Sequence, residues 1–385
     1  MNQKKFRVGG NLLQEWSLYK GQAARRRQAL AGAQNPEGGQ EALGLARLLY
    51  PARQYVVVKK IETQREDCKT FWLGPDQEAG QSELAPFLPG QHLALTALVE
   101  GSPVSRPYSL MSSPAQARQG LYGLTIKAQG LLSRYLVEQA KVGDRFTLTG
   151  PEGDFTWQPL RDAPHLVALA SGSGVAAFLS MAHAVREGDL NLRMTLLYTC
   201  PWQDGFLHKK ELDGLQGSGV EVRYFCPDCP DGSLEPLSAA QVDRAAGQEP
   251  YSLFWCGSPE AMAAFEKLIP QLKTKPQSLR AGEGSVWCAP QKGKGFRLRV
   301  HARTVTYTIE ALPGETLLTA MERAGIAAPA PCRAGRCGFC RSRLIRGEYR
   351  VAPGFEGRLK GEEAEWLHPC CTYPEGDMEF EIYPV

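Results

Sequence analysis

The sequence lacks three features that would assign it to large classes of protein. It has no run close to the ~20 apolar residues that a membrane-spanning helix needs. Its net charge is only +3 over 385 residues, so it lacks the basic footprint of nucleic-acid-binding proteins. Its first residues, MNQKKFRVGGNLLQEW, have neither the apolar core nor the cleavage site of a secretory signal. We therefore expect a cytoplasmic protein with no transmembrane segment and no nucleic acid as partner.

What the sequence does have is an ordinary globular composition and many cysteines. Hydrophobic residues make up 43% and charged residues 22%, and the length predicts two to three domains of ~150 residues each. The eleven cysteines cannot all pair within one chain, because their number is odd. Structural disulfides are also rare in a reducing cytosol. Metal binding, redox chemistry or simple burial must account for these thiols.

Four of the last five cysteines have a spacing that indicates a metal cluster. Three follow the pattern C-x4-C-x2-C, and a fourth comes after 29 intervening residues. Thiolates on this pattern are the plant-type ferredoxin arrangement for a [2Fe-2S] cluster. A structural zinc site is the alternative, but such sites usually show two C-x2-C pairs and these last five cysteines contain only one. The expected ligands are Cys332, Cys337, Cys340 and Cys370, although Cys371 could replace Cys370 on chemistry alone.

The sequence around these cysteines also resembles a plant-type ferredoxin domain. Residues 296–300 (FRLRV) and 304–309 (TVTYTI) alternate as in a hairpin, and a helix is expected to begin near residue 315. The closing strand MEFEIYPV is similar too. Residues 296–385 therefore look like a complete α+β (β-grasp) ferredoxin module. In that family the last ligand is followed by a variable residue, then a small or polar one, then Tyr-Pro, so the position of Tyr373-Pro374 selects Cys370 over Cys371.

A reductant for the cluster is expected earlier in the chain. A [2Fe-2S] cluster accepts one electron whereas NAD(P)H delivers a hydride, so a flavin is the usual converter. Residues 51–160 contain short alternating segments, such as HLALTALV and LYGLTIK, separated by Gly, Pro and Ser turns. This pattern predicts a small antiparallel β-barrel as the flavin-binding domain.

An ordered set of short motifs lies in this β-rich region. The segment Arg106-Pro107-Tyr108-Ser109-Leu110 follows LPGQH, and GLLSRYL, VGD and GPEGDF come after it in that order. The series resembles the ferredoxin–NADP reductase superfamily from about residue 52 to the C-terminus. The resemblance implies that Arg106 binds the flavin phosphate, Tyr108 packs on the isoalloxazine ring and Ser109 lies near the nitrogen that accepts hydride.

The segment GLLS is expected to begin a helix beside the flavin. Helix N-termini present free amides and a positive dipole end to phosphates. Taken alone, Ser133 or Gly130 could simply cap the helix, but in the ordered set we favour phosphate binding by Gly130, Leu131, Leu132 and Ser133. These residues resemble those of FAD-binding members, so FAD is expected, with FMN as the alternative.

Residues 161–272 change pattern and predict an α/β doubly wound nicotinamide domain. Continuous apolar strands alternate with helices, which indicates a parallel sheet. The Gly172-Ser173-Gly174 turn after the first strand is where a dinucleotide pyrophosphate would lie. Cys256-Gly257 resembles the family motif that approaches the nicotinamide ring. We therefore assign the catalytic contacts to Ser109 and Cys256.

The choice between NADH and NADPH leans slightly towards NADH. The family's usual arginine after the second strand of this domain is replaced by Tyr198-Thr199-Cys200-Pro201. That arginine often holds the extra phosphate of NADPH. His208, Lys209 and Lys210 follow and could compensate, since a phosphate binds any converging cations.

Other segments carry weaker expectations. Residues 1–50 can form a helical extension of short amphipathic helices, and residues 273–295 read as a linker. Cys226-Pro-Asp-Cys229 could be a dithiol switch or half a metal site, with Cys200 and Cys256 at neighbouring strand ends. Burial explains free cysteines more often. Cys68 and Cys288 are read as inert.

These features together predict an NAD(P)H-dependent electron-transfer reductase with FAD and a [2Fe-2S] cluster. The resemblance implies a protein acceptor such as an oxygenase, or a hybrid-cluster protein. Six arginines crowd the cluster loop, which favours an acidic docking surface on that acceptor. They are Arg333, Arg336, Arg341, Arg343, Arg346 and Arg350. The alternative function is a redox-sensing or electron-relay module whose extra cysteines form a thiol switch.

Overall fold

The chain divides into two compact units, Met1–Leu49 and Tyr50–Val385. The structure, a computed structural model, describes most of the second unit. The described residues are 53–99, 101–202, 205–217, 219–226, 234–282, 293–326, 328, 330, 333, 335, 338–352 and 365–382. The helical extension expected in residues 1–50 lies outside them.

The first domain is built on a six-stranded antiparallel sheet with the order β4-β3-β6-β1-β2-β5. A bridge between Leu110 and Leu124 joins the chain just after β4 to β5, at the opposite end of the sheet. The expected antiparallel flavin barrel is therefore confirmed. Its strands are β1 (Gln54–Arg65), β2 (Cys68–Pro75), β3 (His92–Val99), β4 (Ser102–Ser109), β5 (Tyr122–Lys127) and β6 (Arg145–Glu152).

Alternation of apolar and polar residues explains why these segments are strands. Gln54, Val56 and Val58 of β1 are buried while Tyr55 is exposed and Val57 is half-buried, because successive side chains point to opposite faces. The inward side chains form one core cluster with Leu93 and Leu95 of β3. Two helices accompany the sheet, α3 (Pro114–Arg118) and α4 (Leu131–Gln139).

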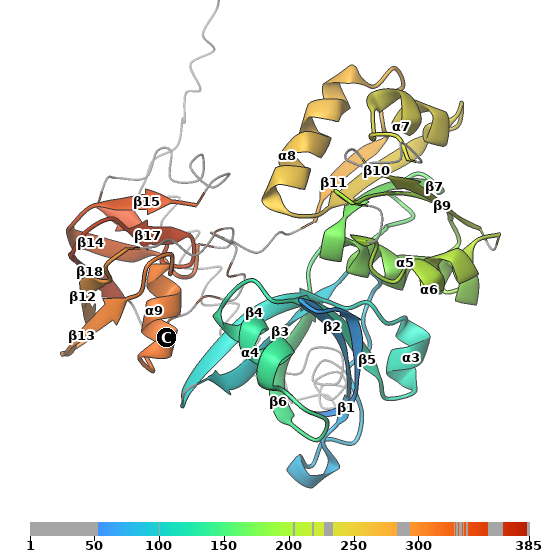
Figure 1. Ribbon diagram of the computed structural model, residues 1–385. Coiled ribbons are helices and arrows are strands. Elements are labelled where there is room, and N and C mark those ends of the chain that lie inside the picture. The colour runs from blue at the N-terminus through green and yellow to red at the C-terminus, as the bar shows by residue number, and fades with distance from the viewer. Residues whose placement is uncertain are drawn as a thin grey trace, which may run out of the picture. The chain divides into compact units, whose positions relative to one another are not determined.

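The second domain is a five-stranded parallel sheet with the order β11-β10-β7-β8-β9. Its strands are β7 (His165–Ser171), β8 (Arg193–Thr199), β9 (Val220–Phe225), β10 (Tyr251–Cys256) and β11 (Ser278–Ala281). Helices α5 (Val175–Glu187) and α6 (Lys209–Leu215) cover one face, and α7 (Ala239–Ala246) and α8 (Pro259–Leu268) cover the other (Figure 1). Strands buried on both faces are expected to be continuously apolar, as β7 and β10 are.

Strand β11 lies inside the segment that the sequence interpretation assigned to a linker. Residues Ser278–Ala281 pair in parallel with β10, so the sheet extends into the segment 273–295. The four residues SLRA are too short to show a strand period, which is why sequence pattern did not reveal them. Residues 283–292 of that segment lie outside the described residues.

The third domain has a five-stranded mixed sheet with the order β13-β12-β18-β14-β16. The expected hairpin is present, and the last strand pairs in parallel with the first. Helix α9 (Leu317–Arg323) begins at Thr316, whose hydroxyl accepts a hydrogen bond from the Thr319 amide. The strands are β12 (Phe296–Ala302), β13 (Val305–Ala311), β14 (Ser342–Arg346), β16 (Trp366–Leu367) and β18 (Met378–Ile382), with β15 (Tyr349–Val351) and β17 (Thr372–Pro374) as a separate pair.

Within the described residues, no helix is long and apolar enough to cross a membrane.

Candidate cofactor site

A cavity of about 560 Å³ joins the barrel to the parallel sheet. It contains every flavin-binding and nicotinamide-binding residue expected from the sequence. The barrel contributes the end of β4 and the start of α4, and the parallel sheet contributes the ends of β7 and β10. The expected residues on its wall are Arg106, Pro107, Tyr108, Ser109, Gly130, Leu131, Leu132, Ser133, Gly172, Ser173, Gly174, Cys256 and Gly257.

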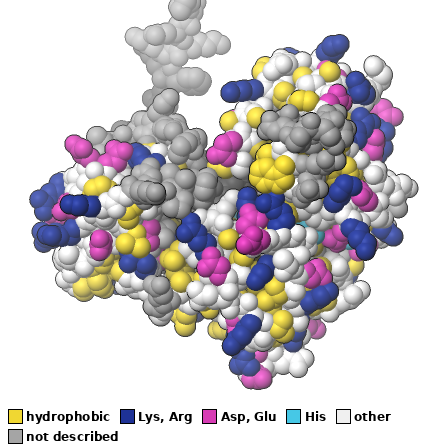
Figure 2. Space-filling model, in the orientation of Figure 1, with side chains coloured by type: hydrophobic (Ala, Val, Ile, Leu, Met, Phe, Trp, Pro, Cys, Tyr) yellow, Lys and Arg dark blue, Asp and Glu magenta, His cyan; other side chains and the backbone are white. Residues whose placement is uncertain are grey.

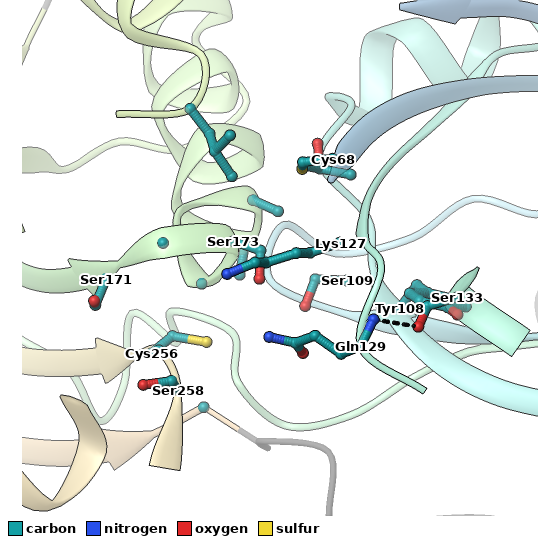
Figure 3. Close-up of a pocket in the computed structure, with 18 of the residues that line it drawn as sticks. Cys68, Tyr108, Ser109, Lys127, Gln129, Ser133, Ser171, Ser173, Cys256 and Ser258 are labelled. Atoms are coloured by element: carbon teal, nitrogen blue, oxygen red, sulfur yellow. Dashed lines mark hydrogen bonds between the residues drawn. The ribbon is translucent and has the colours of Figure 1, made fainter. Parts of the chain in front are cut away.

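The end of β4 presents an unsatisfied polar group to this cavity. The Tyr108 hydroxyl is buried and has no hydrogen-bond partner among the described residues. Burial also raises the pKa of this phenol, so the hydroxyl stays neutral. A buried hydroxyl without a partner is costly, and a polar ligand beside it would remove that cost. Ser109 points into the same space (Figure 3). These two residues fit a flavin.

The start of α4 is capped by the Ser133 side chain and still has backbone amides that a phosphate could use. The Ser133 hydroxyl accepts hydrogen bonds from the amides of Gly130 (2.8 Å) and Gln129 (3.0 Å), so the capping interpretation is confirmed. The first helical bond runs from the Arg134 amide to the Gly130 carbonyl. Helix geometry therefore leaves the amides of Leu131, Leu132 and Ser133 without partners in the helix. They remain suited to an anionic group in the cavity.

Arg106 lies on the cavity wall but its guanidinium also contacts protein groups. Its nitrogens donate to the Glu322 carboxylate (2.6 Å), the Thr319 hydroxyl (2.7 Å) and the Ser105 carbonyl (2.7 Å). Glu322 and Thr319 belong to α9 of the third domain. Arg106 thus connects the cofactor cavity with the ferredoxin-like domain.

On the opposite wall, the turn Gly172–Gly174 follows β7 and meets the end of β10. A Cβ atom at Gly174 would lie 2.5 Å from the Cys256 carbonyl oxygen and 2.7 Å from the Gly257 nitrogen. Only glycine permits this close approach of two backbones. The contact aligns the Gly-rich turn with Cys256, and so brings the predicted pyrophosphate and nicotinamide contacts together.

The thiols in the cavity are neutral at physiological pH. Burial raises the pKa of Cys256 to about 12, and it has the same effect on Cys68. It also raises the pKa of Cys200. All three line the cavity, including Cys68, which the sequence interpretation had treated as isolated. Neutral thiols can form a soft wall, but they are poor nucleophiles and poor metal ligands.

Several cavity residues were not singled out from the sequence. Lys127 is the last residue of β5 and Gln129 follows shortly after it, and both side chains extend towards the nicotinamide-side wall, where Cys256 and Ser258 lie (Figure 3). Asp67 lies 3.7 Å from the Lys127 amine and 3.2 Å from Arg65, so it partly neutralises both cations. The strand pattern of LYGLTIK could have placed Lys127 at the barrel rim. Nothing in the sequence indicated that the rim faces the second domain.

His208 forms a buried contact between the barrel and the parallel-sheet domain. Its Nε2 lies 2.7 Å from the Thr125 hydroxyl on β5, and its Nδ1 lies 3.1 Å from Glu211 on α6. The other Glu211 oxygen lies 2.8 Å from His183 on α5. Burial alone would raise the pKa of Glu211, but the two histidines together outweigh that effect and lower it from 4.5 to about 2.

Two of the four expected cluster ligands lie within the described residues. The sulfurs of Cys340 and Cys370 are 3.3 Å apart and buried. The Gly335 amide donates to the Cys370 sulfur at 3.2 Å, which fits an anionic sulfur at that position. Cys332 and Cys337 lie outside the described residues. No group of three or more metal-binding side chains occurs among the residues that are described.

The remaining cysteines divide as follows. Cys371 is buried, and its thiol donates to the His368 carbonyl. Cys226, at the end of β9, is disulfide-bonded. Cys229 and Cys288 lie outside the described residues, so the proposed dithiol switch stays a prediction.

Comparisons with known proteins agree with this arrangement of domains. Residues 55–157 match the oxidoreductase FAD-binding domain family, and residues 300–375 match the 2Fe-2S iron-sulfur cluster binding domain family. The solved structure of phthalate dioxygenase reductase matches 86% of this chain and 98% of its own, with a TM-score of 0.66 and 20% identity. The two family matches and the order of the domains support a three-domain flavin, nicotinamide and [2Fe-2S] reductase of the ferredoxin–NADP reductase type.

Two curated relatives align over most of this reductase. Tetrachlorobenzoquinone reductase of Sphingobium chlorophenolicum is 27% identical over 298 residues, which cover 76% of this chain and 86% of that protein. The glycine betaine monooxygenase reductase subunit of Pseudomonas aeruginosa is 23% identical over 364 residues, 85% of this chain and 94% of that protein. The reductase therefore has FAD, a [2Fe-2S] cluster and NAD(P)H as its redox groups.

We predict that Gly174→Ala weakens nucleotide binding. Overpacking of this kind costs about 1–3 kcal/mol, so the KM for NADH should rise roughly tenfold. The FAD content should not change, because the flavin-side residues lie on the opposite wall. Steady-state kinetics with ferricyanide and the flavin absorbance per chain would measure both. The matched control is Gly214→Ala on α6, where an added Cβ meets nothing within 4 Å. An unchanged KM in Gly174→Ala would contradict the assignment.

We also predict that His208→Ala disturbs the cavity without removing any cavity-lining group. Misplacement of the two cofactor walls should lower kcat/KM for NADH roughly tenfold. His183→Ala, which breaks only the outer contact to Glu211, should have a much smaller effect. The pKa of Glu211 is lowered to about 2. The stabilisation of the folded protein by this carboxylate is therefore fully present above pH 4.5 and is lost as pH falls towards 2. The larger effect of His208→Ala should therefore be seen at pH 7, where Glu211 is ionised, and kinetics of both variants at that pH would check it.

Proposed function

We propose that this reductase supplies electrons from NADH to the oxygenase component of a multicomponent system. One observation carries the proposal: a single cavity unites the flavin-side residues with the nicotinamide-side residues, and a ferredoxin-like domain follows in the same chain. Relatives named as a monooxygenase reductase subunit and a dioxygenase reductase support this type of acceptor. The cytoplasmic location expected from the sequence stays a prediction.

We assign the cofactors to residues as follows. Tyr108 and Ser109 would hold the isoalloxazine ring, and Arg106 with the amides at the start of α4 would hold the flavin phosphate. Gly172, Ser173 and Gly174 would hold the nucleotide pyrophosphate, with Cys256 beside the nicotinamide. The [2Fe-2S] cluster would be held by Cys332, Cys337, Cys340 and Cys370.

The chemistry needs little acid–base help from the protein. When bound, the flavin accepts a hydride from the nicotinamide and releases electrons singly to the cluster. The chain's own residues bind, orient and exclude water. Ser109 offers a hydroxyl at the flavin, and the neutral Cys256 thiol offers a soft contact without a charge to desolvate.

The surroundings of the nucleotide favour NADH. His208, which could have compensated for the missing arginine, is buried against Thr125 and Glu211. The Lys209 amine lies 2.8 Å from Asp213 and packs over the Tyr224 ring. Both side chains are therefore already engaged, so a 2′-phosphate would gain little from these two residues.

The surface beside the cluster supports an acidic acceptor, but less simply than a count of arginines implies. Arg343 pairs with Glu381 at 2.9 Å and Arg346 with Glu379 at 2.7 Å, although their side chains remain 47% and 69% exposed. Lys and Arg side chains gather over β12, β14 and β18 (Figure 2). Phe339, directly before Cys340, is 66% exposed and would form the apolar centre of the contact. Arg336 lies outside the described residues.

The test of the proposed function is an anaerobic titration of the purified protein with NADH and then NADPH. We expect the visible spectrum to show flavin reduction followed by partial loss of the cluster absorbance, at lower concentrations of NADH than of NADPH. Cys370→Ser is the control, in which flavin reduction persists and the cluster signal is absent. Tighter response to NADPH would contradict the nucleotide assignment.

The same preparation distinguishes the reductase from a redox-sensing module. A reductase oxidises NADH continuously with ferricyanide, whereas a sensor stops after its own centres are reduced. A burst limited to the NADH that reduces the flavin and the cluster, followed by no turnover, would favour the sensor.

For the acceptor, we predict opposite salt effects with proteins of opposite charge. Salt screens attraction between unlike charges and repulsion between like charges. The kcat/KM for an acidic one-electron acceptor protein should fall between 50 and 300 mM salt, by roughly threefold or more, while that for the basic protein cytochrome c should not fall. Arg346→Gln should lower the first value, whereas Arg118→Gln, at an exposed arginine of the barrel domain that pairs with Asp189, should leave it unchanged. The same salt response with both acceptors would contradict the acidic docking surface.

A further inference from the structure

Helix α9 of the ferredoxin domain lies against strand β4 of the flavin barrel, and three polar contacts join them. The Ser102 hydroxyl donates to the Arg323 carbonyl at 2.5 Å. Arg106 donates to the Thr319 hydroxyl and to the Glu322 carboxylate at 2.7 and 2.6 Å. The two partners of Arg106 lie more than 200 residues away in the chain, so this contact depends on domain docking rather than on local structure.

Glu322 is the most buried member of this junction. Its side chain is only 7% exposed, and it is held between two arginines. One carboxylate oxygen accepts from Arg106 of the barrel, and the other accepts from Arg333. A carboxylate this deeply buried is stable only when its charge is compensated on both sides.

Arg333 extends the junction to the cluster loop. It directly follows Cys332 in sequence, its φ of 48° lies in the left-handed region, and its side chain is 14% exposed. Two residues further on, the Gly335 amide donates to the Cys370 sulfur. Glu322 thus accepts from Arg106 of the barrel with one oxygen and from Arg333 of the cluster loop with the other.

We propose that Glu322 is a positioning residue that docks the ferredoxin domain on the flavin barrel and fixes the flavin-to-cluster geometry. Its carboxylate holds Arg106 and Arg333 in one buried row of alternating charge. Arg106 would then serve two partners, the flavin phosphate and the ferredoxin domain. The step that Glu322 supports is the transfer of one electron from the reduced flavin to the oxidised cluster, in which no bond forms or breaks. The inference rests on the assigned cofactor sites but not on the identity of the acceptor.

The test uses the full-length holoprotein and two variants. Glu322→Gln keeps the shape and removes the charge, and Thr319→Val removes the other bond to Arg106. The matched control is Glu379→Gln, because Glu379 is also a largely buried carboxylate of the ferredoxin domain, and the ion pairs that it makes with Arg346, Arg299 and His301 lie within that domain.

The first readout is amide hydrogen exchange, which needs no turnover. Loss of one partner of a buried interfacial charge pair weakens a contact strongly. We expect exchange in the β4 and α9 peptides to rise roughly tenfold in Glu322→Gln and less in Thr319→Val, with no change in Glu379→Gln. Unchanged exchange in both variants, or an equal rise in the control, would overturn the proposal. If Glu322→Gln does not fold, Thr319→Val decides the question.

The second readout is rapid mixing with NADH under anaerobic conditions, without any acceptor protein. We expect flavin reduction to keep its wild-type rate while cluster reduction slows roughly tenfold in Glu322→Gln, since small misplacements have large effects on rate. Equal slowing of both phases would indicate a general structural defect and overturn the assignment. Because no acceptor is present, failure of the oxygenase assignment would leave this result unaffected.

Discussion

The edge position of β4 is the constraint on which the rest of the structure depends. An edge strand pairs on one side only, here with β3, and leaves its other side for further contacts. In most proteins such an edge must be protected from pairing with a strand of another molecule. Here α9 packs against it, and the strand's last residues line the cofactor cavity. One strand therefore meets both neighbours of the flavin, which a central strand could not do.

Both domain junctions contain buried polar contacts, and the junction of the barrel with the parallel sheet also has apolar packing of Phe155 on Phe178 and Phe254. His208 joins the parallel-sheet domain to Thr125 of the barrel, and Glu322 joins the ferredoxin domain to Arg106. Polar contacts of this kind have narrow distance and angle requirements, whereas apolar contacts tolerate sliding. Electron-transfer partners benefit from that specificity, because their rates depend on distance. The neutral thiols around the cavity add packing without introducing charges that would need partners of their own.

Much of this arrangement could be predicted from the sequence, for identifiable reasons. Strand β3 coincides with the alternating segment HLALTALV, since one face of it is buried. The cavity residues came from the order of short motifs, and a motif can report a local requirement such as the helix start at Gly130. What could not be predicted depends on contacts between distant segments. The cavity positions of Cys68 and Lys127, the strand β11 and the Arg106–Glu322 pair have no signal in local spacing.

The arginines near the cluster show why residue counts mislead. Six of them follow Cys332 within 18 residues, which suggests a strongly positive surface. Yet Arg333 pairs with the buried Glu322 at the domain junction. Arg343, Arg346 and Arg350 each have a carboxylate within 4 Å. Long-range attraction depends on net charge, which these carboxylates reduce. Orientation at contact depends on the exposed guanidinium groups themselves and on Phe339. The surface is therefore better suited to fixing the pose of a docked acceptor than to attracting it from a distance.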